Sequence, residues 1–194
     1  MSEDGFHVHG PHDHAIEHAA EGGHGGDDGF SSKIAVTTAI LSTLGALFAY
    51  EGGHTQNAAL LYKNDAAIQK TAASDQWNYY QAKSSKQNLA ELAAALTTGE
   101  DKEKFKQKAD RYEKEKADVK AGAEKLEEAA KEADKQSAEE MHIHGRWAGA
   151  ATLLQISIAL SAIALLTRKK WLMFGVYGAS AVGVGLAVMG AMHM

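Results

Sequence analysis

The five residues TTGED at positions 97–101 lie between two long stretches of helical pattern, and they decide how the chain folds. Gly99 breaks a helix because it lacks a side chain, and Thr98 followed by Asp101 has the form of a capping box that begins another. We therefore predict that the chain leaves one long helix before Gly99 and returns in a second. This gives an antiparallel hairpin with its tip near residues 97–101.

Both arms of the hairpin carry apolar residues at a seven-residue spacing, with a second set four residues further on. Asp75 and Lys86 interrupt the repeat before the tip, and Lys116 interrupts the repeat after it. This spacing is typical of a coiled-coil seam, so we expect both sets to face the opposite arm, with facing residue numbers that sum to about 198. Before the tip the two sets are Leu61, Ile68, Ala82, Leu89 and Leu96, then Ala72, Tyr79 and Ala93. After the tip they are Phe105, Tyr112, Val119, Leu126 and Ala133, then Ala109, Ala123 and Ala130.

Three stretches without Asp, Glu, Lys or Arg flank the hairpin, at residues 34–50, 147–167 and 171–192. Each is long enough to cross a hydrocarbon core of roughly 30 Å, the first only just. We predict an all-α integral membrane protein with three transmembrane helices and a long, coiled-coil-like antiparallel helical hairpin between the first and second. The predicted segments are a disordered tail (1–32), transmembrane helices (33–50, 147–167 and 171–192), the extramembrane hairpin (51–146) and a basic loop (168–170).

The apolar stretches contain small and uncharged polar residues that favour helix packing over transport. No charged residue lies mid-membrane, which argues against a proton pump or a charged transport path. Gln155 is expected to hydrogen-bond to another helix in preference to lining a pore. Trp147 and Trp171 are expected to anchor their helices at the interfaces, and Gly52 with Gly53 is the expected hinge at the base of the hairpin. Close packing is also expected from a ribbon at intervals of four, made of Gly175, Ala179, Gly183, Ala187 and Ala191.

Basic residues near the ends of the apolar stretches indicate the orientation in the membrane. The loop at 168–170 is Arg-Lys-Lys, and Lys33 lies on the same side if all three stretches cross. This favours a cytoplasmic amino terminus and a periplasmic hairpin in a bacterial inner membrane. Basic residues on the other side weaken the argument: Lys63, Lys131, Lys135 and Arg146.

Composition excludes several other classes of protein. The net charge is −5 with both signs interspersed, so nucleic-acid binding is not expected. The chain has no cysteine, which excludes disulfides and thiolate metal sites. About thirty residues precede the first apolar stretch, so we expect an uncleaved anchor and not a signal peptide. No nucleophile with a base, phosphate loop or zinc-protease pattern occurs, and we expect no enzymatic activity.

Two groups of histidines are candidate metal ligands, since neutral imidazole binds zinc or nickel. The first is in the tail and includes His7, His9, His12 and His14; we favour a solvated tail that binds metal only opportunistically. The second is at the base of the hairpin, where His54 is expected to face His144, with His142 and His193 nearby. These four can bind a divalent cation or titrate together near neutral pH. We favour the simpler interpretation of polar residues at headgroup level, with no cofactor.

An aromatic segment, SDQWNYYQAKS at residues 74–84, lies in the first arm. It is either a recognition surface for an unidentified protein or the place where hairpins pack side by side, and we favour the second.

The stretches QNAALLYKNDAAIQKTAASDQWNYYQAKSSKQNLAEL (56–92), LLQISIALSAIALLTRKKWL (153–172) and FHVHGPHDH (6–14) resemble the bacterial domain-of-unknown-function 4337 family. This resemblance implies a bacterial membrane protein with one span, a helical middle and two closing spans. It implies no activity and no functional residues.

The function expected from the sequence is that of a non-enzymatic bacterial inner-membrane protein. It would self-associate in the lipid bilayer and project its hairpin as a scaffold or interaction module. The alternative is a metal- or pH-responsive oligomeric channel or transport accessory that uses the histidines. A weaker third possibility is a subunit of an enzyme whose catalytic partner is another protein.

Overall fold

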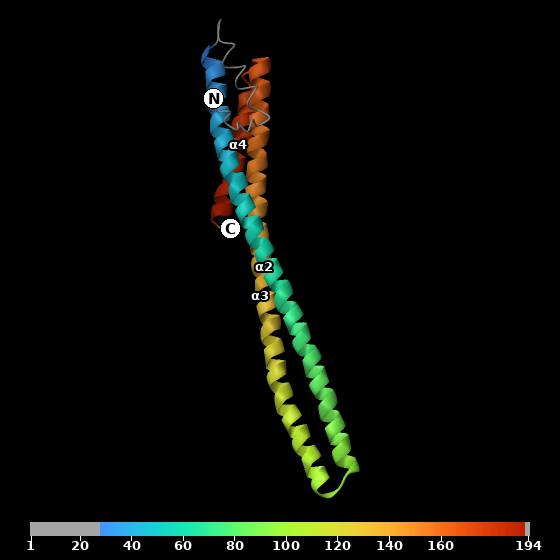
Figure 1. Ribbon diagram of the computed structural model, residues 1–194. Coiled ribbons are helices and arrows are strands. Elements are labelled where there is room, and N and C mark those ends of the chain that lie inside the picture. The colour runs from blue at the N-terminus through green and yellow to red at the C-terminus, as the bar shows by residue number, and fades with distance from the viewer. Residues whose placement is uncertain (1–27, 193–194) are drawn as a thin grey trace, which may run out of the picture. The chain divides into compact units, whose positions relative to one another are not determined.

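The computed structural model describes residues 28–192, and over that range the chain consists of three α-helices and no strand. They are α2 (Asp28–Leu96), α3 (Gly99–Thr167) and α4 (Leu172–Ala191) (Figure 1). The chain forms two compact units. The three-helix unit comprises residues 28–55 and 142–192, and the hairpin unit comprises residues 56–141.

The break between α2 and α3 is where the TTGED stretch predicts it. Between α2 and α3 the only non-helical residues are Thr97 and Thr98. Gly99 has a φ of 66°, which a residue with a side chain rarely adopts. Glu100 and Asp101 follow in the first turn of α3, where carboxylates interact favourably with the positive end of the helix dipole. By contrast, α2 stays helical through Gly52 and Gly53, so these glycines do not end a helix.

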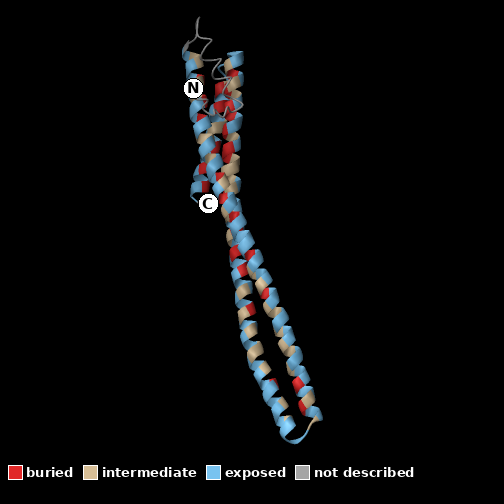
Figure 2. Ribbon diagram, viewed as in Figure 1, coloured by how far each residue is buried: buried red, intermediate tan, exposed pale blue. Residues whose placement is uncertain are grey.

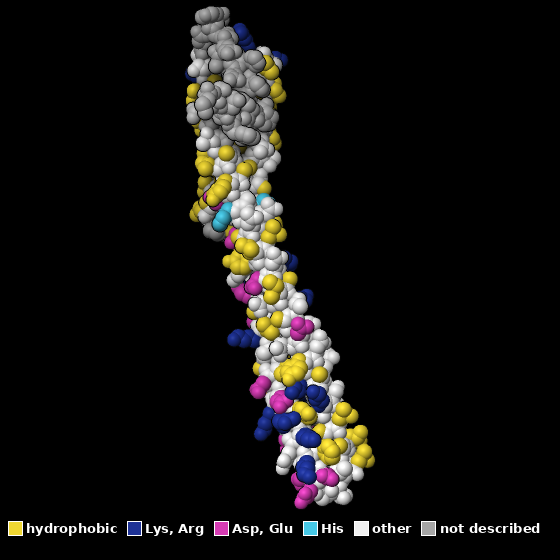
Figure 3. Space-filling model, viewed as in Figure 1, with side chains coloured by type: hydrophobic (Ala, Val, Ile, Leu, Met, Phe, Trp, Pro, Cys, Tyr) yellow, Lys and Arg dark blue, Asp and Glu magenta, His cyan; other side chains and the backbone are white. Residues whose placement is uncertain are grey.

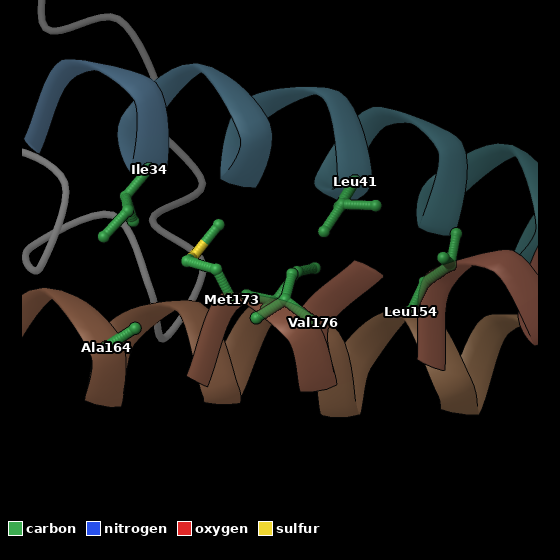
Figure 4. Packing of buried hydrophobic residues seen from close by; sticks show 7 residues of the cluster. Ile34, Leu41, Leu154, Ala164, Met173 and Val176 are labelled. Carbon is green, nitrogen blue, oxygen red and sulfur yellow. The ribbon is translucent and has the colours of Figure 1, made fainter. Parts of the chain in front are cut away.

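The three-helix unit packs large aliphatic side chains from all three helices into one core (Figure 4). Each of its helices includes a stretch long and apolar enough to cross a membrane. Only 17%, 39% and 22% of the most apolar windows of α2, α3 and α4 are buried, so most of their apolar surface faces outward. This distribution suggests a membrane protein. The core residues are Ile34, Leu41, Leu154, Ile158, Ala164, Met173 and Val176.

Helix α4 packs against its neighbours within the chain along only part of the predicted ribbon of small residues. Of the ribbon at intervals of four, Gly183 and Ala187 are buried, whereas Gly175 and Ala191 are exposed. A step of four residues advances about 40° around a helix, so five such positions cannot all face one neighbour. The buried residues of α4 are spaced by three, seven, four and three residues, as expected for one face of a helix. They are Met173, Val176, Gly183, Ala187 and Gly190.

The hairpin unit joins α2 and α3 through small side chains, and its register is the predicted one. Lys63 pairs with Asp134 and Lys83 with Glu115, so that the paired numbers sum to 197 and 198. The Ser137 hydroxyl donates a hydrogen bond of 2.9 Å to the Ala59 carbonyl oxygen across the same seam. The buried alanines are Ala59, Ala66, Ala73, Ala90 and Ala94 in α2, and Ala109, Ala123, Ala130 and Ala133 in α3 (Figure 2).

The predicted seam is therefore correct in α3 and wrong in α2. In α2 the alanines at 59, 66 and 73 face α3. Leu61 follows Ala59 by two residues, or about 200° around the helix, and so points away. The alanines and the predicted seam residues are both spaced by seven. The alanines face α3 because their small side chains let the two backbones approach closely. The exposed fractions of the predicted seam residues are 70% for Leu61, 65% for Ile68, 66% for Leu89 and 78% for Leu96.

Candidate functional site

His144 is the one histidine of the described residues that has a specific hydrogen bond. Its Nδ1 lies 2.8 Å from the carbonyl oxygen of Gly52, in the adjacent part of α2. A carbonyl oxygen only accepts, so Nδ1 carries the proton and Nε2 is left as the acceptor. The bond fixes the orientation of the imidazole ring.

The other predicted metal ligands do not form a metal site within the described part of the chain. His54 and His142 are exposed. Within residues 28–192, no group of three or more His, Asp or Glu side chains is arranged to hold a metal ion. His193 lies outside the described residues, as do the tail ligands His7, His9, His12 and His14. Metal binding at either group therefore stays a prediction.

Trp147, three residues after His144 in α3, packs against both α2 and α4 within the three-helix unit. Its ring centroid is 5.6 Å from that of Phe48 in α2. On α4, a Cβ added at Gly190 would lie 3.3 Å from the Trp147 indole, and one added at Gly52 would lie 3.4 Å from the Trp147 Cβ. Both glycines therefore leave room for the tryptophan. Sequence reasoning assigned Trp147 to the membrane interface but missed this packing role.

Gln155 lies on the outward face of α3, in the middle of its apolar stretch. It has no hydrogen-bond partner among residues 28–192, so the predicted bond to another helix is not made within this part of the chain. The buried hydroxyls of the unit bond to their own helices instead. Ser157 donates to the Leu153 carbonyl oxygen at 2.9 Å, and Ser161 donates to that of Ser157 at 2.9 Å.

The most unusual surface of the hairpin unit is an exposed apolar line on α2, which we call the α2 stripe. Figure 3 shows hydrophobic side chains scattered among charged ones along the hairpin. Of the described residues of α3 from Gly99 to Met141, Met141 is the only large exposed apolar residue, and the rest of its outward surface is mainly charged. The two arms therefore differ sharply in outward chemistry. The α2 stripe consists of Leu61, Ile68, Tyr79, Ala82, Leu89 and Leu96.

The predicted aromatic segment is divided between this stripe and a groove on the hairpin. Tyr79 is in the stripe and is half exposed. Trp77 instead donates its indole N–H to a Glu127 carboxylate oxygen at 2.8 Å, and it contacts Tyr80 edge to face at 5.5 Å between centroids. Trp77 and Glu127 also line a groove of about 790 Å³ between the arms. The segment thus ties α2 to α3 as well as facing outward.

Two ion pairs connect the arms, and they shift the pKa values of Lys83, Glu115 and Asp134. The Glu115 carboxylate accepts a hydrogen bond from Lys83, which lowers the pKa of Glu115 below its ordinary value of 4.5 and raises that of Lys83 above 10.5. Tyr79 also raises the pKa of Lys83. Lys63 lowers the pKa of Asp134 in the same way. These pairs help to set the register of the hairpin.

Comparison with known proteins identifies a family but no characterised relative. No curated protein and no solved structure matches the chain. A family model described as "Domain of unknown function (DUF4337)" matches residues 30–193, which covers both units of the structure. The chain therefore belongs to the DUF4337 family.

Proposed function

We propose that this protein is a non-enzymatic bacterial inner-membrane protein that self-associates and presents its hairpin as a scaffold or interaction module. The observation that carries the proposal is the α2 stripe. Large apolar residues repeated at heptad spacing on an exposed helix face are expected to be covered, since such a repeat is typical of a helix that packs on a partner helix. A lipid-facing role does not account for the stripe, because Asp, Glu and Lys residues surround it on both arms.

The orientation we propose places the amino terminus in the cytoplasm and the hairpin in the periplasm. The ammonium group of Lys170 lies 5.6 Å from the centre of the Phe30 ring. The basic loop and the start of α2, with Lys33, are therefore at the same end of the three-helix unit. Clustered positive charge of this kind favours the cytoplasmic side.

The proposal is tested by measuring the mass of the full-length protein in detergent and in lipid nanodiscs over a range of concentrations. We expect a concentration-dependent oligomer that is lost in the variant Ile68→Lys with Leu89→Lys. The control is Asp118→Lys with Glu128→Lys, which also places two lysines at exposed positions of the hairpin, but on α3. A wild-type monomer at all concentrations, or an oligomer insensitive to the stripe, would overturn the proposal.

A further inference from the structure

The α2 stripe continues at heptad spacing through two charged residues, Asp75 and Lys86. Both are exposed, and neither forms an ion pair with another described residue, although Lys86 acts at a distance on Glu115. In a seam that meets a partner helix, each of these charges would be opposed by a residue of the partner. Their positions therefore restrict which partner, and which register, the stripe can accept.

A second copy of the stripe fits in one antiparallel register, in which facing residue numbers sum to 161. Asp75 of one copy then faces Lys86 of the other, and the two-fold symmetry repeats this pair. Around the pair, each large side chain faces a small one. The opposed residues are Ala72 with Leu89, Tyr79 with Ala82, and Ala93 with Ile68, each occurring twice. Asp65 falls opposite Leu96 at the two ends of the contact, where water has access.

The parallel in-register arrangement of two stripes is disfavoured by the same residues. It would place Asp75 against Asp75 and Lys86 against Lys86, and like charges that face each other across a seam are destabilising. An unrelated partner helix would need opposite charges placed to face both Asp75 and Lys86, whereas a second copy of this chain already carries them.

We infer that the α2 stripe binds the α2 stripe of a second copy as an antiparallel pair centred between residues 80 and 81, with Asp75 and Lys86 forming two symmetrical ion pairs. The inference deepens the proposed function, because it names the surface and the register of self-association. In this arrangement the two Gln56 residues, at the start of each hairpin unit, lie about 70 Å apart. The pair would therefore act as a spacer between two membrane anchors.

The register is tested by disulfide formation, for which a chain without cysteine provides a clean background. Full-length Ile68→Cys and Ala93→Cys, carrying tags of different length, are co-expressed, extracted in detergent and oxidised. We expect a mixed disulfide between positions 68 and 93. Neither variant alone should form a disulfide dimer, because the two copies of position 68 would be about 37 Å apart. A disulfide dimer of Ile68→Cys alone, or no disulfide in an oligomeric sample, overturns the register.

The ion pairs are tested by reversing charges in the same full-length protein. Asp75→Lys should weaken self-association by about tenfold or more, since two attractive pairs become repulsive. Lys86→Asp should do the same, and the double variant should restore the wild-type affinity. Single variants as strong as wild type, or a double variant as weak as the singles, contradict the inference. In either case a wild-type oligomer that is still lost in Ile68→Lys with Leu89→Lys would leave the broader scaffold function standing, so the two failures are distinguishable.

Discussion

The three-helix unit and the hairpin unit bring their helices together in the same way but differ in what surrounds their large apolar side chains. In both, small residues occupy close contacts, such as Gly183 in the first and Ala123 in the second. In the three-helix unit the outward residues are apolar nearly throughout, as suits contact with lipid. In the hairpin the large exposed apolar residues lie almost entirely on α2, among charged residues.

Exposed apolar side chains therefore occur in two different surroundings within one chain. Ile156 in α3 and Ile68 in α2 are exposed by 48% and 65%, and exposure alone does not distinguish them. Their neighbours do. Ile156 lies in a stretch without charges, which suits contact with lipid, whereas Ile68 lies two residues before the charged Lys70. We therefore propose that a protein partner covers Ile68.

The largest expected effect comes from placing a lysine at each of these two isoleucines. Ile156→Lys should cost about 3 kcal/mol of insertion free energy, because it puts a charge near the centre of the apolar stretch. The variant should be depleted from the urea-washed membrane fraction. Ile68→Lys should remain in that fraction and lose only self-association. Normal insertion of Ile156→Lys would show that this face does not contact lipid.

A second expected effect concerns the inward and outward alanines of α2. Ala73→Leu should destabilise the hairpin by about 1–3 kcal/mol, because Ala73 is buried against α3 and a larger side chain overpacks the seam. Ala82→Leu, on the stripe, should leave that stability unchanged. Thermal unfolding of the full-length protein in detergent, followed by circular dichroism, measures both. Equal losses would mean that the arms do not meet through the alanine face.

A third effect compares two glycines of α4. A Cβ added at Gly183 would lie 3.2 Å from the Ala150 carbonyl oxygen, whereas one added at Gly185 would have nothing within 4 Å. Gly183→Ala should therefore be less stable than Gly185→Ala by about 1–2 kcal/mol, since the backbone of α3 has to move. Resistance to unfolding by a denaturing detergent provides the measurement. Identical stabilities would contradict the close contact of α4 with α3.

The smallest expected effect is a pH dependence confined to the hairpin. Because the folded pKa of Glu115 is lowered, its ion pair contributes stability above about pH 4.5 and loses it as the pH falls through the lowered pKa. Glu115→Gln should therefore lose less thermal stability than wild type between pH 7 and pH 3. Glu113→Gln, at an exposed carboxylate that forms no ion pair with another described residue, should behave as wild type. The same loss in Glu115→Gln as in wild type would show that the pair does not contribute.

The helices, the tip and the hairpin register could all be predicted from the sequence, because each follows from local features. TTGED marks the break, and counting outward from Gly99 aligns Lys83 with Glu115. The inward face of α2 could not be predicted, because alanines and leucines both repeat every seven residues, and only the approach of α3 chooses between them. The bond from His144 to Gly52 was missed because a backbone carbonyl gives no sequence signal. The outward position of Gln155 could not be predicted, because its rotation about the axis of α3 depends on how α3 packs.

The two-residue link at Thr97 and Thr98 has a consequence for how such a chain can change over evolutionary time. Helices α2 and α3 are each 69 residues long and are joined with no slack at the tip. An insertion in one arm alone would shift every cross-arm pair beyond it and turn the alanine face away. Viable length changes should therefore occur in both arms together and in multiples of seven residues. Natural variation in this family should then show paired insertions and deletions at equal distances from the tip.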